Sequence, residues 1–357
     1  MDGIDAALVC FESSSSLHLV DTYFHEFTPD IRSEISHTAQ NNGDLRANQD
    51  SPLHKKLAPI YADACMALLE KSGFGRQQIK AIANHGQTVK HEPNAKTPYS
   101  LQLGDGQIIA DLTQITTITQ FRQGDLAVGG QGAPLMPAFH SAIFGANSDT
   151  FVVNIGGIAN LTRLGSPLIG FDTGPGNVLL DQWMELNNGM PFDENGRWAA
   201  TGTVNSELLE CLLADSFFAQ TYPKSTGTDY FNIAWLKRHF SQLHELNTAD
   251  VQATLLALTC ESIAQQLETL SQAASGSVKL YVCGGGVQNS ALMLALSKRL
   301  ATVQVQSTDE LGLPANWLEA IGFAWLGYCK DHNIASNCPS VTGASSEVVL
   351  GQIFSPS

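Results

Sequence analysis

The chain has 357 residues, 43% of them hydrophobic and 15% charged, which is the composition of a globular protein and excludes a disordered one. Its formal net charge of −15 argues against binding to nucleic acids or anionic membranes, because both need a basic surface. No apolar run approaches the roughly 20 residues that span a bilayer. We therefore expect a soluble chain of two domains.

The cysteines and the first residues indicate the compartment. The seven cysteines are an odd number and form no CxxC pair, which favours reduced thiols over disulfides or a zinc site. The opening MDGIDAALVCFE carries acids where a signal peptide needs positive charge. We expect a cytoplasmic protein.

Strands and helices alternate along the chain. The segment 51–73 is typical of a helix, with Ser51 as a cap and Pro52 in the first turn. Expected strands are 4–11, 17–27, 79–84, 116–121, 279–286 and 303–308, and further expected helices are 105–114, 249–273, 289–300 and 317–330. This alternation predicts an α/β fold.

Two segments far apart in the chain resemble each other. FVVNIGGIAN (151–160) and LYVCGGGVQN (280–289) align without gaps, and Val153 aligns with Val282. The match is what two related strand–turn units of a duplicated architecture would show, and ten positions can also agree by chance.

Both segments contain a glycine-rich turn after a strand. Such a turn lets backbone N–H groups approach a phosphate, although many glycine turns only end strands. Neither turn is a Walker A loop, and neither completes GxGxxG, which disfavours hydride transfer. The sequence also lacks GxSxG and HExxH.

The stretch GFDTGPGN (170–177) places one acid, Asp172, among three glycines and a proline. A turn so poor in side chains lets a ligand approach closely, which favours a catalytic role. The alternative is a helix N-cap for 177–187, a position that Asn177 fills better.

Other polar residues have alternative interpretations. Arg122 and Asp125 in FRQGD form either a surface ion pair or an anion-binding fork. The loop 223–232 (PKSTGTDYFN) is typical of a solvated loop, and Glu319 on an apolar helix face needs a partner. His85 and His91 in HGQTVKH fit no usual metal spacing, and we expect no protein-held metal site.

Eight motifs occur in one order over nearly the whole chain: HGQTVKHEP, FRQGDLAVGGQGAPLMPAFH, NIGGIANLT, GFDTGPGN, PKSTGTDYFN, DVQATL, CGGGVQN and PSVTGAS. Together they resemble the anhydro-N-acetylmuramic acid kinases of the sugar kinase, heat-shock chaperone and actin superfamily. The resemblance implies two actin-like (ribonuclease H-like) domains around an interdomain cleft. We place them at 1–125 plus 334–357 and at 126–333.

The resemblance also implies an activity. The family uses ATP, Mg²⁺ and water to convert 1,6-anhydro-N-acetylmuramic acid into N-acetylmuramic acid 6-phosphate in peptidoglycan recycling, and it suggests a homodimer. Asp172 matches the catalytic acid. The nucleotide-binding candidates are Asp2, Gly3, Asn154, Gly156, Gly157, Gly284, Gly285, Gly286 and Asn289. The substrate-binding candidates are His85, Gln87, Arg122, Asp125, Gln131, Gly174, Asn177 and Glu319.

The chain departs from the family at its start. The family opens with a strand and a phosphate loop ending in G-T-S-L-D-G, of which MDGID keeps only the tail. Either the start is assigned too late, which the match downstream favours, or half of the phosphate grip is absent. The alternative functions are a kinase for another sugar, a phosphatase of the same superfold, and an ATP-responsive binding protein.

The substrate chemistry accounts for a single acid. In the anhydro sugar O6 is bound to C1, so water must attack C1 while O6 takes the phosphoryl group. Inverting glycoside hydrolysis normally needs a base for the water and an acid for the leaving oxygen. The phosphoryl group captures the leaving oxygen here, so one carboxylate suffices.

Overall fold

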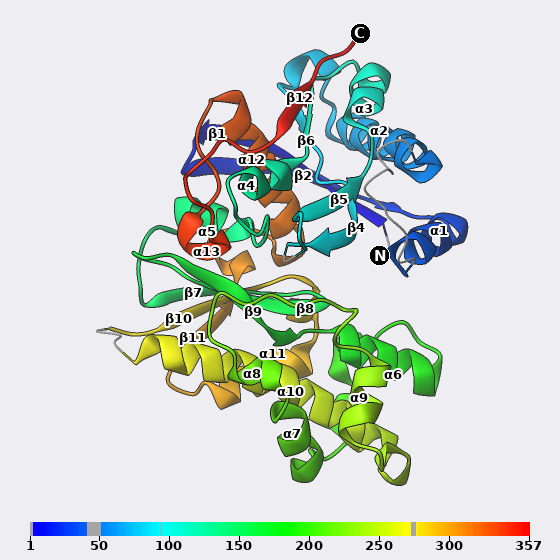
Figure 1. The fold of residues 1–357 in the computed structure, drawn as a ribbon, viewed down its shortest axis with the longest axis vertical. Coiled ribbons are helices and arrows are strands. Elements are labelled where there is room, and N and C mark those ends of the chain that lie inside the picture. Colours follow the sequence, from blue (N-terminus) through cyan, green and yellow to red (C-terminus); the bar gives the residue numbers. More distant parts are fainter. Residues whose placement is uncertain (1–2, 41–50, 94, 273–275) are drawn as a thin grey trace. The chain divides into compact units, whose positions relative to one another are not determined.

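The computed structural model describes residues 3–40, 51–93, 95–272 and 276–357 (Figure 1). The nucleotide-site candidate Asp2 lies outside these residues. The chain divides into two compact units, which we call unit 1 (Met1–Ile143 with Glu319–Ser357) and unit 2 (Phe144–Leu318). Each unit contains both strands and helices, so the predicted α/β class is confirmed.

The unit boundaries differ from those expected at 125/126 and 333/334. Helix α4 (Phe121–Ala127) stays with unit 1 because Asp125 accepts hydrogen bonds from Asn337 and Thr342. Helix α12 (Leu318–Asp331) lies with the same unit because its Gly327 packs against Ala83. Contacts between segments distant in sequence, which a motif search does not register, therefore set the boundaries.

The described residues of unit 1 contain three separate groups of strands. A two-stranded antiparallel hairpin, a two-stranded antiparallel pair and a three-stranded sheet of order β12-β6-β3 are present. Its strands are β1 (Gly3–Ser13), β2 (Ser16–Glu26), β3 (Ile82–Ala83), β4 (Gln87–Glu92), β5 (Tyr99–Leu103), β6 (Thr117–Thr119) and β12 (Gln352–Phe354). Its helices are α1 (Pro29–Gln40), α2 (Pro52–Ser72), α3 (Gly106–Thr113), α4, α5 (Met136–Phe144), α12 and α13 (Pro339–Thr342).

Helix α2 forms where the sequence predicts it. The Ser51 hydroxyl accepts a hydrogen bond from the His54 backbone N–H, and Pro52 occupies the first turn. Gly73 ends the helix at φ +73°, a left-handed conformation that glycine adopts without strain. The helix buries Leu57 and Tyr61 in a core shared with α1, β4 and β5.

The described residues of unit 2 form one five-stranded sheet. Its strands are β7 (Thr150–Ile155), β8 (Ile158–Arg163), β9 (Ile169–Pro175), β10 (Lys279–Cys283) and β11 (Gln304–Ser307). Its helices are α6 (Val178–Asn188), α7 (Ser206–Leu213), α8 (Ser216–Ala219), α9 (Ile233–His239), α10 (Thr248–Ser271) and α11 (Ser290–Arg299). The strand order is β11-β10-β7-β8-β9, with antiparallel pairs from β7 to β9 and parallel pairs from β7 to β11.

The structure explains the sequence echo within unit 2. The two matching segments form neighbouring parallel strands, β7 and β10, and Val153 lies opposite Val282 in their register. Both strands therefore end at the same edge of one sheet and lead into glycine turns. The echo therefore joins two neighbouring strands of a single unit.

Helix α10 crosses beneath this sheet and packs against β8, β9, α6, α7 and α11 (Figure 1). It begins at an Asn247 cap whose side chain accepts from the Ala249 N–H. Leu255, Leu258 and Ile263 are fully or almost fully buried in the unit 2 core. A helix buried on most of its circumference can place its few polar side chains against the backbone of neighbouring turns.

Among the residues that the structure describes, no helix combines the length and apolarity required to cross a membrane. All seven cysteines are thiols.

Candidate functional site

Three glycine-containing turns converge at one edge of the unit 2 sheet. They follow β7 (residues 156–157), β9 (176–177) and β10 (284–289). The Gly176 N–H donates to the Gly157 carbonyl at 2.9 Å, and the Asn177 N–H donates to the Gly156 carbonyl at 2.8 Å. The backbone itself therefore brings the motifs NIGGIAN and GFDTGPGN together.

Two glycines are required by this close approach. A Cβ at Gly176 would overlap the Gly156 carbonyl oxygen, and a Cβ at Gly284 would overlap the Asn154 side chain and crowd the Ile155 carbonyl. Gly284 also has φ +80°, which other residues rarely adopt. The three turns can thus pack against one another only because these positions carry no side chain.

Other glycines of the same turns face open space, as a phosphate cradle requires. A Cβ at Gly156 would have only the Ile158 carbonyl oxygen within 4 Å, at 3.6 Å. A Cβ at Gly285 would meet only Asn177 Nδ2, at 3.8 Å. Gly157 is solvent-exposed. These bare, accessible backbone segments fit the polyphosphate of a nucleotide.

The asparagines of the turns have specific partners. Asn289 caps α11, because its Oδ1 accepts from the Leu292 N–H at 3.0 Å. Asn177 directly precedes α6, at the N-cap position, but its Nδ2 donates to the Ile155 carbonyl at 3.3 Å and its side chain makes no capping hydrogen bond. The expectation that the Asn177 side chain caps this helix is therefore wrong. The side chain instead connects the turn after β9 to the end of β7.

Asp172 lies within β9, half-buried, opposite Asn160 of β8. Its backbone N–H donates to the Lys224 carbonyl at 3.1 Å, and its Oδ2 accepts from the Thr226 backbone N–H at 2.9 Å. Its place inside a strand excludes the N-cap alternative. The hydrogen bond from an N–H group stabilises the ionised carboxylate, which is the form that accepts a proton.

The chain opposite Asp172 differs from the sequence prediction. The segment 223–232 was expected to be a solvated loop, and half of its residues are exposed, but Lys224 and Phe231 are buried. Burial lowers the pKa of the Lys224 ammonium from 10.5 to about 8, while the Asp172 carboxylate acts in the opposite direction.

Helix α10 supports the turn after Asp172, a contribution that sequence reasoning missed. The Thr259 hydroxyl donates to the Gly176 carbonyl at 2.9 Å. Gly174 packs closely on Phe218 and Ser262, where a Cβ would lie 2.7 Å from the phenyl ring. The only signal in the sequence was a threonine and a serine within an apolar helix. Gly174, a substrate-binding candidate, is buried at this contact.

In unit 1, Arg122 and Asp125 of α4 hold the same glycine. Arg122 donates from a terminal guanidinium nitrogen to the Gly132 carbonyl at 2.9 Å, and the Gly132 N–H donates to Asp125 Oδ2 at 2.7 Å. Their spacing of three residues places both side chains on one side of the helix. The motif FRQGD therefore fixes the glycine-rich loop that follows it.

Asp125 is completely buried, which excludes the surface-pair alternative for this residue. Its Oδ1 accepts hydrogen bonds from Asn337 Nδ2 at 2.9 Å and from the Thr342 hydroxyl at 2.7 Å. A buried carboxylate with several donors is satisfied without a countercharge. Asp125 thus joins α4 to the segment around α13.

His85 contacts Arg122 directly. Arg122 Nε–H donates to His85 Nε2 at 3.1 Å, so this nitrogen must be unprotonated. Burial holds the pKa of His85 well below its ordinary value of 6.5, and the Arg122 charge lowers it further. His85 also stacks on Phe323, with ring centroids 4.3 Å apart. Neutral His85 therefore orients the guanidinium.

His91 and Glu319 also respond to the Arg122 charge. Burial lowers the pKa of His91 to about 4, with a further contribution from Arg122, and His91 Nδ1 lies 3.0 Å from the Ser100 hydroxyl. Desolvation raises the pKa of the Glu319 carboxyl, Arg122 lowers it and Asp5 raises it. Glu319 keeps solvent-exposed surface, so water screens these influences.

The remaining candidates of unit 1 are more peripheral to this group. Gln131 donates its backbone N–H to the Thr342 carbonyl at 2.9 Å, and Gln87 Nε2 donates to the Thr88 carbonyl at 3.1 Å. Gly3, expected at the tail of a phosphate loop, instead begins strand β1 and pairs with Glu26.

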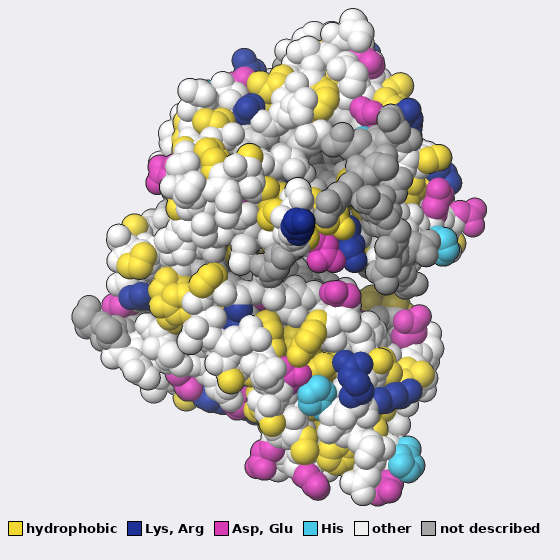
Figure 2. Space-filling model, viewed as in Figure 1, with side chains coloured by type: hydrophobic (Ala, Val, Ile, Leu, Met, Phe, Trp, Pro, Cys, Tyr) yellow, Lys and Arg dark blue, Asp and Glu magenta, His cyan; other side chains and the backbone are white. Residues whose placement is uncertain are grey.

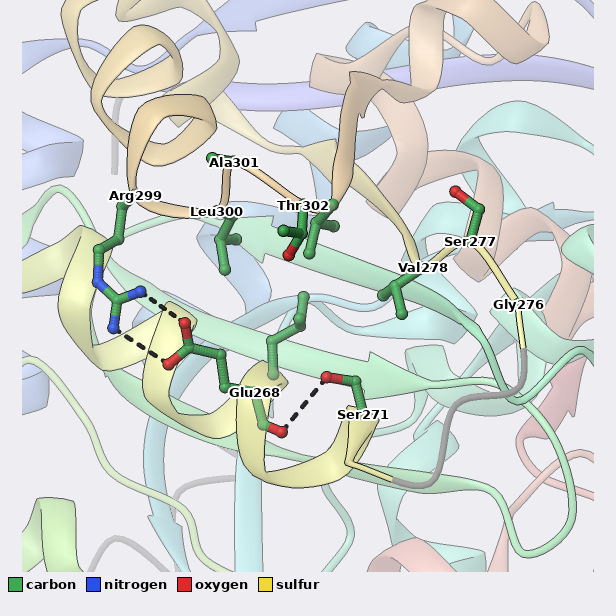
Figure 3. Close-up of a pocket in the computed structure, with 11 residues that line it drawn as sticks. Glu268, Ser271, Gly276, Ser277, Val278, Arg299, Leu300, Ala301 and Thr302 are labelled. Atoms are coloured by element: carbon green, nitrogen blue, oxygen red, sulfur yellow. Dashed lines mark hydrogen bonds and ion pairs between the residues drawn. The ribbon is translucent and has the colours of Figure 1, made fainter.

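A cavity of about 480 Å³ lies elsewhere in unit 2 (Figure 3). It is lined by residues of α10, by Arg299 of α11 and by the residues before β10 and β11, at the amino ends of these two strands and so away from the glycine turns. Arg299 donates from both terminal nitrogens to the Glu268 carboxylate and from Nε to Glu261 at 2.7 Å. Its guanidinium is committed to α10, so this cavity is not the candidate active site.

No group of three or more His, Cys, Asp or Glu side chains suited to a metal ion occurs in the described parts of the chain.

Comparisons with known proteins identify the same family over nearly the whole chain. The family model for anhydro-N-acetylmuramic acid kinase matches residues 1–356. The anhydro-N-acetylmuramic acid kinase of Pasteurella multocida is 45% identical, covering 99% of this chain and 94% of that protein. The protein of the same name from Haemophilus influenzae is 45% identical, covering 99% and 95%.

A likeness to solved structures is more distant. Component A of the (R)-2-hydroxyglutaryl-CoA dehydratase of Acidaminococcus fermentans is 12% identical, with a TM-score of 0.44, over 92% of this chain and 99% of that chain.

Proposed function

Because the chain belongs to the anhydro-N-acetylmuramic acid kinase family, we propose that it opens 1,6-anhydro-N-acetylmuramic acid with water and phosphorylates O6 at the expense of ATP. The product is N-acetylmuramic acid 6-phosphate, and the proposed role is the recovery of cell-wall sugar. The observation that supports this most is Asp172, a lone carboxylate beside converging glycine turns whose accessible faces suit a polyphosphate.

We propose that Asp172 is the base. As water attacks C1, its proton passes to the Asp172 carboxylate, the C1–O6 bond breaks, and O6 takes the γ-phosphoryl group as the bond to ADP breaks. The proton on Asp172 then returns to solvent. Base catalysis by a positioned group is worth about 10²–10⁴-fold. The Thr226 N–H keeps one carboxylate oxygen fixed while the proton is taken.

The glycine turns are the proposed nucleotide site. Gly156 and Gly285 present backbone without close side chains, Gly157 is exposed but lies next to the Thr228 side chain, and Asn154 borders Gly284. Phosphoryl transfer asks the protein mainly for alignment and charge neutralisation. We expect Mg²⁺ to arrive with ATP and to neutralise the phosphate charge. The family resemblance also assigns Gly3, Gly286 and Asn289 to this site.

For the sugar, the proposed contacts are Arg122, His85 and Glu319 of unit 1, with Arg122 binding the lactyl carboxylate. A guanidinium oriented by a neutral histidine suits a planar carboxylate. The family resemblance further assigns Gln87, Asp125, Gln131, Gly174 and Asn177 to the sugar site. Asp125 acts there by fixing the loop at Gly132.

We further propose a cytoplasmic homodimer that binds neither nucleic acid nor membrane. Thiol-form cysteines support the compartment, and the net charge of −15 supports the absence of nucleic-acid and membrane binding. The homodimer is what the family resemblance implies. On the face shown in Figure 2, a small group of basic side chains gathers at the lower right, and the others lie singly among acidic and uncharged ones.

A substrate screen tests the function. ADP release is measured with the 1,6-anhydro sugar and with open-ring N-acetylmuramic acid, and only the anhydro sugar should support rapid turnover. Phosphorylation of the open-ring sugar at a similar rate would indicate an ordinary sugar kinase. Nucleotide binding without sugar binding, measured by titration calorimetry, would indicate an ATP-responsive binding protein.

A further inference from the structure

Lys224 is a buried lysine in an exposed segment. Its neighbours Tyr222, Pro223 and Ser225 are exposed, whereas Lys224 keeps only 5% of its surface. Burying an ammonium group is costly unless partners compensate. The burial of the Lys224 side chain beneath a surface loop therefore requires specific partners that stabilise it.

The partners of the ammonium lie on two elements of unit 2. Lys224 Nζ donates to the Phe217 carbonyl of α8 at 3.1 Å. It lies 4.6 Å from the centroid of the Phe217 ring and 5.9 Å from that of Phe171, the residue before Asp172. The hydrogen bond and the two aromatic faces offset part of the desolvation cost. They also fix the position of the side chain.

The backbone of the same segment makes two hydrogen bonds with Asp172. The Lys224 carbonyl accepts from the Asp172 N–H at 3.1 Å, and two residues later the Thr226 N–H donates to Asp172 Oδ2 at 2.9 Å. The Lys224 side chain is thus the inward anchor of the segment that orients the carboxylate.

The charges around Lys224 also favour a link to Asp172. Asp172 is the carboxylate whose charge raises the pKa of Lys224 against the effect of burial. Asp215, at the start of α8, is engaged by Tyr230, Trp235 and His239. Tyr230, whose ring contacts that of Phe217, donates its hydroxyl to Asp215. The Lys224 cation therefore acts mainly on Asp172.

We propose that Lys224 is a positioning residue for Asp172: its buried ammonium anchors the segment 224–226 against the carboxylate and favours the ionised form of that carboxylate. This inference rests on the proposed role of Asp172 as the base. It adds a residue to the reaction that does not itself contact the sugar.

The first test is kinetic and uses the full chain. Lys224→Met keeps the apolar stem and removes the charge, and kcat should fall about 10- to 100-fold, as for a slightly misplaced catalytic group. The acid limb of the kcat/KM profile should move to higher pH, because the carboxylate loses a favourable cation. The wild type should lose activity above about pH 8 as Lys224 deprotonates, and this loss should be absent in the variant.

Two variants control for simple structural damage. Lys224→Arg restores the cation and should return the acid limb towards the wild-type position. Lys237→Met removes an exposed lysine of α9 and should leave both kcat and the pH profile unchanged. An unchanged pH profile in Lys224→Met would overturn the proposal, even if kcat falls.

The second test does not depend on activity. NMR of protein carrying ¹³C-labelled lysine follows the titration of Lys224, assigned by its absence in Lys224→Arg. In Asp172→Asn the pKa of Lys224 should fall, because the carboxylate that raises it is gone. An unchanged Lys224 pKa would contradict the inference, and this result does not depend on whether Lys224→Met folds. Full activity of Asp172→Asn would instead contradict the proposed role of Asp172 as the base, whatever the pKa of Lys224 in that variant.

Discussion

Unit 2 and unit 1 form their candidate site residues in different ways. In unit 2 the backbone does most of the work: three turns pack together because glycines allow carbonyl and N–H groups to meet at hydrogen-bonding distance. In unit 1, side chains of α4 hold the loop, with Arg122 and Asp125 bonded to opposite sides of Gly132.

The sheets differ in the same sense. In unit 2, β7 pairs with β8 on one side and β10 on the other, so one continuous sheet presents all three turns at a common edge. Among the described residues of unit 1, no strand joins the β1–β2 hairpin to the β12-β6-β3 sheet. We therefore expect the unit 2 site to be sensitive to atoms added at Gly176 and Gly284, and the unit 1 site to atoms removed from Arg122 and Asp125.

The largest effect is expected at Gly176. Gly176→Ala places a methyl group onto the Gly156 carbonyl, the two turns must separate, and the free energy of unfolding should fall by about 3 kcal/mol. Chemical denaturation measures this. Gly156→Ala is the matched variant: its methyl group has room, so stability should hold while ATP affinity falls in calorimetry. Equal free energies of unfolding in the two variants would contradict the claim that close backbone packing at Gly176 requires a glycine.

The corresponding test in unit 1 removes atoms. Asp125→Ala leaves the buried Gly132 N–H without its acceptor and removes one of the acceptors of Asn337 Nδ2 and of the Thr342 hydroxyl, which should cost about 2–3 kcal/mol of unfolding free energy. Asp63→Ala, an exposed acid on α2, should change it by less than about 0.5 kcal/mol. A similar small change in both variants would show that Asp125 does not hold the loop.

A smaller effect is expected at Arg122. Arg122→Ala should raise KM for the anhydro sugar about tenfold, or roughly 1.4 kcal/mol, and lower kcat less, because the guanidinium binds substrate before and during the reaction alike. Steady-state kinetics decide this, with exposed Arg76→Ala as the unaffected control. An unchanged KM would assign Arg122 to holding Gly132 and His85 only.

The fold was largely predictable because its signals are local. Helix α2 follows from Ser51, Pro52 and Gly73, and the glycine turns follow strands as expected. The unit boundaries were not predictable, because Asp125 is assigned by contacts with Asn337 and Thr342 more than 200 residues away.

The candidate site was predictable only in part. Asp172 and the glycine turns are marked by unusual composition, and the structure brings them together. Lys224 and Thr259 were not predicted to support the site, because a lysine in a Ser-Thr-Gly loop and a threonine in an apolar helix are indistinguishable from solvated or packing residues by pattern alone. Which way such side chains point depends on tertiary packing around Phe217 and Gly176.

The central claim is that Asp172 deprotonates the water that opens the anhydro bridge. Its most direct test is the rate of ADP release with the 1,6-anhydro sugar in Asp172→Asn, alongside chromatography of the sugar products. The account predicts a folded protein whose turnover falls by about 10²–10⁴-fold, with ring opening and phosphorylation lost together. Turnover close to that of the wild type, or ring opening that persists without phosphorylation, would contradict it.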